Sequence, residues 1–375
     1  MHLKKEEFRE MMFFLEKSYG HSRGFFPRTA PHVWRKETID YENRIIAKEE
    51  GKIVSHVGIF PLTMVVKDTE IKMGGIGGVA TLPEFRGKGY MSKLMNFSIQ
   101  KMRKDGYPLS ILWGDRQRYG YFGYEVTGRE IIFTLSRRSL KRSLRLPSVN
   151  IMRLEEKEDL LEKIILIHNK EPIHIKRKRE DYTLIFTKPG LITYLAEKEG
   201  DFAYLSFYGE QFSSALGECG GNPEILFSLI YHLLERWERE SLEIPFPYFP
   251  SNLFFHLLKV CSHWYFRPLG MVKILNLRET IRSYFPFLKK RTQGLEFKGT
   301  LTLEIEENKE RITLNFNSGL TVKEDGEEGE KVSLPEREMV KFLFESPYMV
   351  KMNKSFPLIY LLFPLPLYVA PLDRI

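Results

Sequence analysis

The sequence has few of the features that mark secreted, membrane-spanning or metal-binding proteins. Among 375 residues there are only two cysteines, Cys219 and Cys261, which cannot form a disulfide framework, so a reducing cytoplasm is expected. No run of roughly 18 apolar residues is free of proline, which argues against a membrane-spanning helix. The nine histidines are scattered, and no cluster of His, Cys and Asp has the spacing of metal ligands. We therefore expect a cytoplasmic protein without a metal ion.

The residues that are present point to well-filled globular domains. Hydrophobic residues make up 43% and aromatic residues 13% of the chain, and its length suits two or three domains. The formal net charge of +8 would attract anionic partners. Much of this charge lies in three short runs that are typical of solvated surfaces: 136–145, 176–179 and 289–291. No nucleic-acid partner is expected.

The first 136 residues alternate between strands and helices. A helix with an apolar face ends at Gly20, and strand-like segments follow it. The glycine-rich segment 74–81 reads as a strand that another element approaches closely, because glycines leave space beside it. An amphipathic helix comes after Pro83, and strands at 109–113 and 129–135 complete the unit. This β-α-β order predicts neighbouring, largely parallel strands.

Two further regions follow the first. Residues 137–276 repeat a similar order, with a strand at 213–220 and a helix that Asn222 caps, so this region looks like a degenerate second copy. Later, alternating strands and a helix predict a small α+β domain, in which Ser333 and Glu336 fit a capping box. The predicted domains are 1–136, 137–276 and 277–375.

The residues that can carry chemistry are concentrated in GVATLPEFRGKGYMSKLM, at 78–95. This segment reads as a strand, a turn and a helix. Gly87 and Gly89 allow positive φ angles and remove side chains, so backbone N–H groups can converge on one point. Arg86 and Lys88 add positive charge where the helix dipole is already positive. Such a turn suits a pyrophosphate.

This turn, Arg86-x-x-Gly89, resembles the acetyl-CoA signature of GNAT N-acetyltransferases. Met91 stands where the generic pattern has Gly or Ala, and a large apolar residue there is a feature of Eis-type (enhanced intracellular survival) acetyltransferases. The element Tyr-Gly-x-Phe-Gly-Tyr at 119–124 also resembles that family. The resemblance covers essentially the whole chain. It implies an α/β (α+β) fold of tandem GNAT-like domains with mixed central sheets and a sterol-carrier-protein-like α+β domain at the C-terminus.

The resemblance also implies roles for individual residues. Tyr119 would be the general acid, and the terminal carboxylate of Ile375 the general base, with the tail returning to the active site. Acetyl-CoA would be the cosubstrate, bound by Val79, Ala80, Thr81, Arg86, Gly87, Lys88, Gly89, Tyr90, Met91, Ser92, Gly114 and Asp115. The acceptor would be a primary amine on an aminoglycoside, a polyamine or a lysine. The assembly would be a homo-oligomer, either a trimer or a hexamer.

General physical chemistry is consistent with these roles. An alkylamine titrates near pH ~10, so it must lose a proton before it attacks a thioester. A terminal carboxyl has a pKa of roughly 3.5 in water, but the apolar tail at 356–372 would desolvate it and raise that pKa. Alternatively, Arg374 pairs with the carboxylate and keeps its pKa low. The neutral phenol of Tyr119 can protonate the departing thiolate, and a strand amide near Val79 can polarise the thioester carbonyl.

The sequence also allows other interpretations. The chain could be a GNAT scaffold that has lost catalysis and binds a lipid or another ligand. The segment 75–80 also fits a dinucleotide fingerprint, but Pro83 follows it and no helix opens at the required position. Asp115 and Glu125 could attract a cationic amine or be ordinary surface charges. His56 is expected to be a packed or pocket-lining residue.

Overall fold

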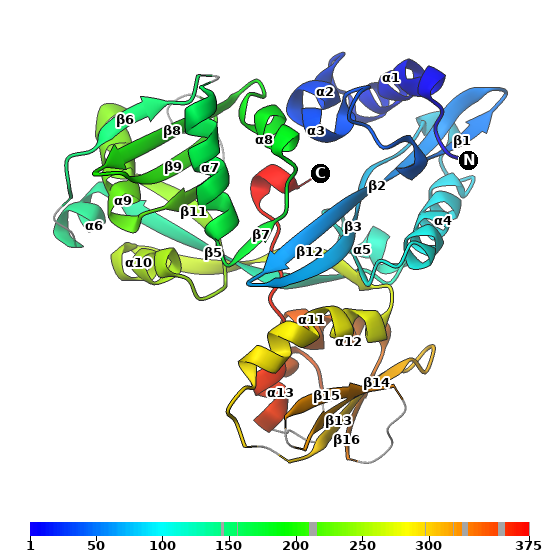
Figure 1. Ribbon diagram of the computed structural model, residues 1–375. Coiled ribbons are helices and arrows are strands. Elements are labelled where there is room, and N and C mark those ends of the chain that lie inside the picture. Colours follow the sequence, from blue (N-terminus) through cyan, green and yellow to red (C-terminus); the bar gives the residue numbers. More distant parts are fainter. Residues whose placement is uncertain are drawn as a thin grey trace.

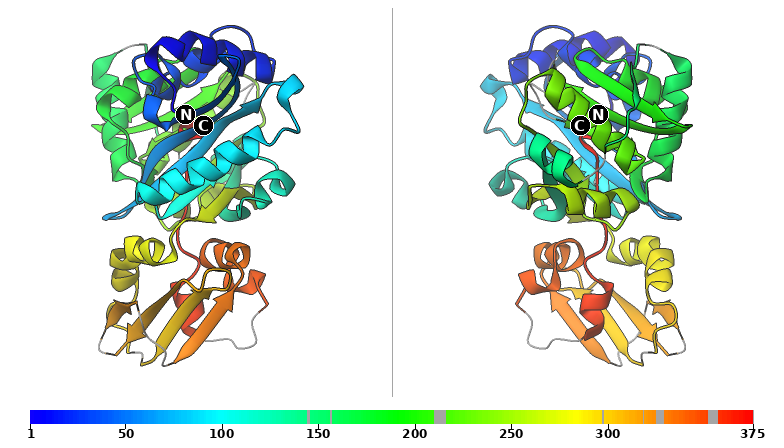
Figure 2. Two further views of the ribbon diagram at one scale, coloured as in Figure 1. Left: turned by 90° about the vertical axis from the view of Figure 1, so that its right-hand side faces the viewer. Right: turned by 90° about the vertical axis from the view of Figure 1, so that its left-hand side faces the viewer.

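The computed structural model describes residues 1–143, 146–155, 157–209, 216–296, 298–317, 319–324, 329–351 and 357–374. Within these ranges the strands form three sheets, so the protein is a mixed α/β protein. In Figure 1 the first unit (blue and cyan) and the second (green) lie side by side above the third (yellow to red). Figure 2 shows the third unit as a separate lower tier.

The largest sheet has eight strands in the order β1-β2-β3-β4-β12-β5-β11, with β7 paired to β2. These strands are β1 (Arg44–Glu49), β2 (Lys52–Val66), β3 (Thr69–Thr81), β4 (Leu109–Leu112), β5 (Glu125–Ser136), β7 (Ile173–Ile175), β11 (Ser241–Pro247) and β12 (His263–Ile274). β3 and β4 are parallel and are connected through α4 (Tyr90–Lys104), as the β-α-β pattern predicts.

The strand order differs from the expectation at β12. This strand comes from the second region of the sequence, yet it lies between β4 and β5 and is antiparallel to both. β4 and β5 are therefore not neighbours, and the prediction of largely parallel strands is wrong, since β3 with β4 is the one parallel pair among the described strands of this sheet. Pairing between segments so distant in the sequence leaves no local pattern, which is why periodicity cannot reveal it. The predicted domain limit between residues 136 and 137 therefore separates strands that belong to one sheet. The domain limits remain a prediction.

Helices cover both faces of the first part of this sheet. α1 (Phe8–Tyr19), α2 (Phe25–Thr29) and α3 (Pro31–Trp34) lie over one face and α4 over the other. Successive residues of β1 alternate accordingly, since Ile45 packs with α4 and Ile46 with α1. A Cβ on Gly74 would lie 2.3 Å from the Met102 sulfur, so only glycine lets α4 come this close to β3. The expected close approach is confirmed.

The second unit has its own four-stranded sheet, in the order β10-β9-β8-β6. α9 packs on one face of it, and α7 and α8 on the other. The predicted cap is confirmed, because the Asn222 side chain accepts hydrogen bonds from the N–H groups of Glu224 and Ile225. The elements are α6 (Arg137–Ser143), β6 (Asn150–Arg153), α7 (Glu158–Lys170), α8 (Arg179–Phe186), β8 (Leu191–Lys198), β9 (Asp201–Tyr208), β10 (Leu216–Gly221), α9 (Pro223–Arg236) and α10 (Asn252–Val260).

The described residues of the third unit form a four-stranded sheet, in the order β15-β14-β13-β16, and three α-helices. The predicted capping box is wrong, because Ser333 lies in β16 and its hydroxyl donates to Glu304 at 3.2 Å. The first N–H of α12, that of Glu336, is instead bound by the Glu307 carboxylate. The elements are α11 (Leu277–Arg291), β13 (Thr300–Ile305), β14 (Arg311–Phe316), β15 (Leu320–Lys323), β16 (Glu330–Leu334), α12 (Glu336–Phe344) and α13 (Pro357–Leu362).

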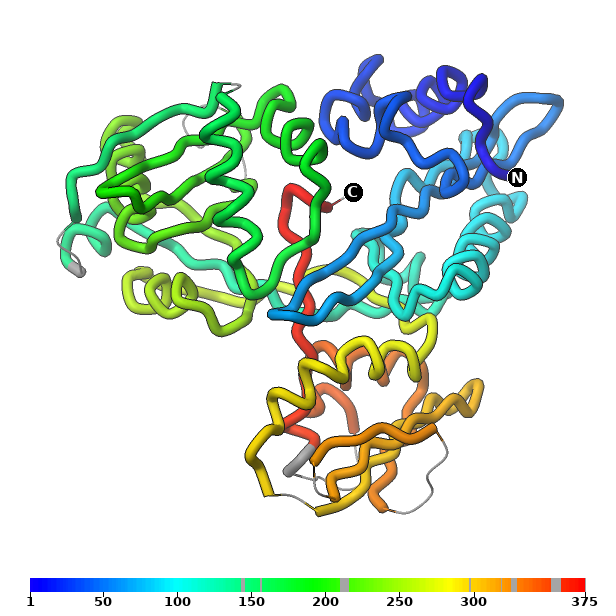
Figure 3. Tube along the Cα trace, viewed as in Figure 1, coloured from blue at the N-terminus to red at the C-terminus, as the bar shows by residue number. Residues whose placement is uncertain are grey.

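The C-terminal tail leaves the third unit after α13 and passes between the other two. Figure 3 shows it as a red tube that ends beside the first and second units. Its apolar side chains are buried, including Leu365, Leu367, Val369 and Leu372. Among the helices that the structure describes, none is long and apolar enough to cross a membrane.

Candidate active site

The central sheet opens at the carboxyl ends of β3 and β4. The two strands pair from Met73 with Leu109 to Ile76 with Leu112, and no farther. Beyond that point β3 continues for five residues paired only to β2, while the chain after β4 turns away at Trp113. The edge of β3 at 77–81 therefore borders a gap between strands. Free backbone groups on such an edge can bind an extended ligand as an added strand would be bound.

A bulge distorts β3 at the mouth of this gap. His56 pairs with Ala80 and Gly58 with Gly77, so β3 has one more residue than β2 between these pairs. Gly78 has φ +60°, and a Cβ there would lie 2.8 Å from the Trp34 ring, so glycine is required. The His56 imidazole is fully buried and bonds the Gly78 carbonyl at 2.7 Å. Burial lowers the pKa of His56 to about 3, so it is a neutral packed residue, as expected.

The turn between β3 and α4 is exposed and carries the predicted glycines in the left-handed region. Gly87 has φ +77° and Gly89 φ +79°, with open space where a Cβ would stand. Gly89 is the N-cap residue of α4 and supplies no side-chain cap, so the first N–H groups of the helix have no side-chain acceptor. The Arg86 Nε donates to the Thr81 carbonyl at 3.3 Å, and the Lys88 ammonium lies over the Phe85 ring. Together these features form a cationic, glycine-lined cradle for an anion.

Tyr119 is held at the other side of the gap, in the short helix α5 (Arg116–Gly120). The Asp115 carboxylate caps this helix by accepting from the Arg118 N–H at 2.7 Å. Gly114 lies directly against the Tyr119 ring, since a Cβ would stand 2.3 Å from ring atom Cε2. Both residues therefore position Tyr119, whose side chain is 8% exposed.

A second tyrosine, Tyr19 of α1, is near enough to Tyr119 for the two phenols to influence each other electrostatically. Burial raises the pKa of Tyr119 above its usual value, although Arg118 opposes this, so the phenol is neutral near pH ~7. Burial and then the neighbouring Tyr119 raise the pKa of Tyr19 to about 12. The Tyr19 hydroxyl donates to the Val79 carbonyl at 2.9 Å, which fixes it at the bulged edge of β3. The sequence does not point to Tyr19, because a tyrosine at the end of an amphipathic helix carries no signal of its own.

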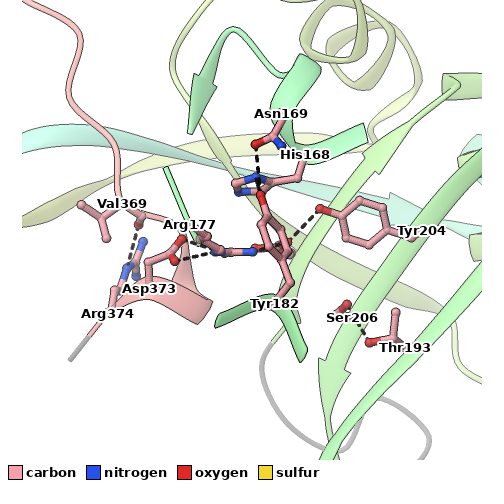
Figure 4. A network of polar contacts seen from close by, with 11 residues as sticks. His168, Asn169, Arg177, Tyr182, Thr193, Tyr204, Ser206, Val369, Asp373 and Arg374 are labelled. Atoms are coloured by element: carbon pink, nitrogen blue, oxygen red, sulfur yellow. Dashed lines mark hydrogen bonds and ion pairs between the residues drawn. The ribbon is translucent and has the colours of Figure 1, made fainter. Parts of the chain in front are cut away.

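A buried ion-pair network anchors the tail to the second unit (Figure 4). The Arg177 guanidinium binds the Asp373 carboxylate through two hydrogen bonds of 2.7 Å. It also binds both oxygens of Glu218, at 3.1 and 2.6 Å. The carboxylates of Glu218 and Asp373 lie with His168 close enough to hold a metal ion. Arg177 hydrogen-bonds to both carboxylates, and the His168 imidazole is hydrogen-bonded to the Tyr182 hydroxyl, so these groups already have partners within the protein and we interpret the cluster as structural.

This network places Arg374 beside the gap. Its guanidinium donates to the Val369 carbonyl and to the buried Glu130 carboxylate, and it lies 5.8 Å from the Trp113 ring centre. Trp113 immediately precedes Gly114, so the tail runs next to the segment that holds Tyr119. Ile375, the predicted base, lies outside the described residues.

A pocket of about 350 Å³ lies between the tail and the first two units. Gly78 of the bulge forms part of its wall, together with residues of α2, α3, the second unit and the tail. Neither acid suggested for attracting a cationic amine lines it. Asp115 caps α5, and the Glu125 carboxylate is bound by Arg116 and Arg337. The sequence could not reveal this pocket, because the segments that form it are far apart along the chain.

A larger groove of about 780 Å³ lies elsewhere, between β5, β12, α10, α11 and the tail. It does not include the open edge of β3, the turn or Tyr119, so we do not assign the chemistry to it. Its walls are mainly aromatic and aliphatic, with basic residues at the rim: Lys67, Arg129, Lys290 and Arg291.

Comparison with known families fits this geometry. Residues 1–127 match the acetyltransferase (GNAT) domain family. This match indicates that the protein is an acyltransferase enzyme. No curated protein sequence matches the chain.

Solved structures resemble nearly the whole chain. A protein from Enterococcus faecalis, described as a probable N-acyltransferase, has 18% identity and a TM-score of 0.66 over 91% of this chain and 88% of its own. A GCN5-related N-acetyltransferase from Kribbella flavida has 16% identity, a TM-score of 0.66 and the same coverage. Eis1 from Mycobacterium abscessus has 14% identity and a TM-score of 0.62, over 91% of this chain and 87% of its own. At such identities these likenesses show a shared fold.

Proposed function

We propose that the protein transfers an acetyl group from acetyl-CoA to a primary amine at the gap between β3 and β4. The observation that carries this proposal is the combination of an unpaired strand edge, an anion-binding turn and a neutral tyrosine around one opening. The edge at Val79, Ala80 and Thr81 would bind the extended arm of the cosubstrate by backbone hydrogen bonds. Its phosphates would lie against the cradle formed by Arg86, Gly87, Lys88, Gly89, Tyr90, Met91 and Ser92.

Tyr119 is proposed as the general acid. The amine nitrogen attacks the thioester carbon, the carbon–sulfur bond breaks, and the Tyr119 hydroxyl gives its proton to the departing thiolate. A strand amide near Val79 would polarise the thioester carbonyl during the attack. Because its raised pKa keeps the phenol protonated, Tyr119 is ready to donate.

The base is proposed to be the terminal carboxylate of Ile375. Support comes from the preceding residues, since Asp373 is anchored by Arg177 and Arg374 lies over Trp113 beside the site. The guanidinium of Arg374 donates to the Glu130 carboxylate and the Val369 carbonyl, which holds the residue before Ile375 in place. Appending a short peptide after Ile375 should remove this carboxylate and abolish turnover, while acetyl-CoA still binds.

The central test is thiol release from acetyl-CoA in the presence of a panel of amines. Tyr119→Phe should lower kcat about a hundredfold or more and leave the Kd for acetyl-CoA unchanged. Tyr121→Phe is the matched control, because the Tyr121 ring lies two residues away and is 91% exposed. Full activity in Tyr119→Phe would remove the acid from the mechanism, and absence of acetyl-CoA binding in the unmodified protein would refute the function.

The finer family assignment is also a proposal. An Eis-type protein would have a second GNAT-like domain, a sterol-carrier-protein-like third domain and a trimeric or hexameric assembly. Supporting features are the second strand–helix junction at β10 and α9, and the four-stranded sheet with parallel β13 and β16 in the third unit. Light scattering on the purified protein tests the assembly, and cell fractionation tests the proposed cytoplasmic location.

A second candidate function is binding of a lipid or similar ligand. The aromatic groove of about 780 Å³ favours it, because its volume and apolar walls suit a small amphiphile. Native mass spectrometry after mild purification distinguishes the two functions, since co-purified lipid supports this second one and bound CoA supports acetyl transfer.

A further inference from the structure

The walls of the 350 Å³ pocket indicate what kind of amine it takes. Four aromatic side chains line it, from α2, α3 and β9: Phe25, Phe26, Trp34 and Tyr208. Two basic side chains, Lys188 and Arg374, complete the polar part of the wall. Among the residues that the structure describes, no carboxylate lines the pocket. Both charged side chains that the structure describes on this wall are cationic, so they would repel a polycationic acceptor.

Lys188 places a buried positive charge in the pocket wall. Its side chain is 5% exposed, and its ammonium lies 5.1 Å from the Tyr208 ring centre. Within the described part of the chain it has no ion pair. The carboxylates that attract it electrostatically are Asp373 and then Glu218, neither forms an ion pair with it, and both are hydrogen-bonded to Arg177. Buried charges in proteins are ordinarily paired, so a buried ammonium at a pocket wall indicates an anionic group in the ligand.

We infer that the acceptor is an aromatic amine that also carries a small anionic group such as a carboxylate. The ring packs between Phe25, Phe26 and Trp34, the anion binds Lys188, and the amine points to the bulge at Gly78. This inference rests on the proposed function, because it names the substrate class of the same site. Arg374 is held by Glu130, so it contributes long-range attraction and Lys188 the direct contact.

Two matched pairs of amines test this with the full-length protein. L-phenylalanine and L-phenylalaninamide differ at the carboxylate, as do 4-(aminomethyl)benzoate and benzylamine. In L-phenylalanine the carboxylate is close to the amine, and in 4-(aminomethyl)benzoate it lies on the far side of the ring. At least one carboxylate member should have a kcat/KM about tenfold or more above its neutral partner, the size expected for a hydrogen bond to a charged group. A polyamine and an aminoglycoside should be poorer still.

The variant Lys188→Met removes the charge and keeps an apolar stem in the buried site. It should abolish the preference for the carboxylate member, so that the two members of a pair have similar kcat/KM values. Lys259→Met is the control, since Lys259 is exposed on α10, and it should keep the preference. An equal loss for both members would mean that Lys188 acts on the tail, which overturns the inference.

Failure of the inference and failure of the proposed function give different results. Turnover that favours neutral or cationic amines in the unmodified protein overturns the inference and leaves acetyl transfer intact. If no amine releases thiol from acetyl-CoA, the proposed function falls and the inference falls with it. The comparison of matched amines needs no variant, so the test stands even if Lys188→Met does not fold.

Discussion

Two of the junctions at which a strand leads into a helix, β3 to α4 and β10 to α9, differ in how the helix begins. Between β3 and α4 the chain forms an open turn, with Gly89 as an N-cap that offers no side chain. Between β10 and α9 one residue suffices, and Asn222 binds the N–H groups of Glu224 and Ile225. Pro223 has no N–H at all. The second helix start is therefore already occupied by the protein's own side chain.

The difference explains how similar strand–helix junctions can bind a phosphate or hold a structure together. A helix N-terminus attracts anions only if its N–H groups are free and approachable. At the first junction no side chain binds these N–H groups, which lowers the stability of the helix. At the second junction the Asn222 side chain binds them and stabilises the helix. The same division extends to the buried charges, because Arg177, Glu218 and Asp373 lie at the second unit and serve to hold the tail. The predictions below test this division of roles.

The largest expected effect is on stability, from Arg177→Met. This change leaves Glu218 and Asp373 as buried carboxylates without their cation, which costs about 3–5 kcal/mol of the free energy of unfolding. Arg179→Met is the control, because its ion pairs with Glu158 and Glu162 are exposed and worth ~0.5 kcal/mol or less. Urea unfolding measures both. Equal stability of the two variants would show that the network does not hold the tail.

Glu171 should make stability fall as pH rises. Burial and the nearby Glu218 raise its pKa to about 7. A group with a raised pKa stabilises the fold below its unfolded pKa, and this contribution is lost as pH rises through the folded value. Glu171→Gln removes this pH-dependent loss. Between pH ~5 and ~8 the free energy of unfolding of the variant should therefore rise by on the order of 2 kcal/mol relative to that of the unmodified protein. Parallel pH profiles for the two proteins would contradict this.

At the first junction, Gly89→Ala should weaken acetyl-CoA binding about tenfold, because a left-handed φ costs a non-glycine residue on the order of 1–3 kcal/mol and the turn must shift. Gly106→Ala is a closely matched control. Gly106 has φ +77° and open space around it, but it lies at the other end of α4. Calorimetric titration should give an unchanged Kd for the control. A similar loss in both variants would trace the effect to strain in general.

The smallest effect is expected at the second junction. Asn222→Ala removes the cap of α9 and should lower the free energy of unfolding by about 1 kcal/mol. The Kd for acetyl-CoA should stay the same, because this helix start takes no part in binding. A change in acetyl-CoA affinity would break the comparison between the two junctions.

The sequence predicts the local features of the site well. Gly87 and Gly89 are found in the left-handed region, Asn222 caps α9, and the glycines of β3 admit α4, since each depends on residues close in the chain. The features that were missed depend on distant segments. Ser333 fits a cap by spacing alone, yet pairing of β16 with β13 holds it in a strand. Likewise Tyr19 and Lys188 reach the site only through packing, which no local pattern encodes.

The position of β12 has a consequence for how the chain is made. The gap that receives the cosubstrate is bounded by β4, and β4 is completed on its other side only by residues 271–274. When β4 and β5 have emerged from the ribosome, β12, which pairs with both of them, has therefore not yet been synthesised. We expect nascent chains shorter than this to expose an unpaired sheet edge, which calls for protection by a chaperone during synthesis.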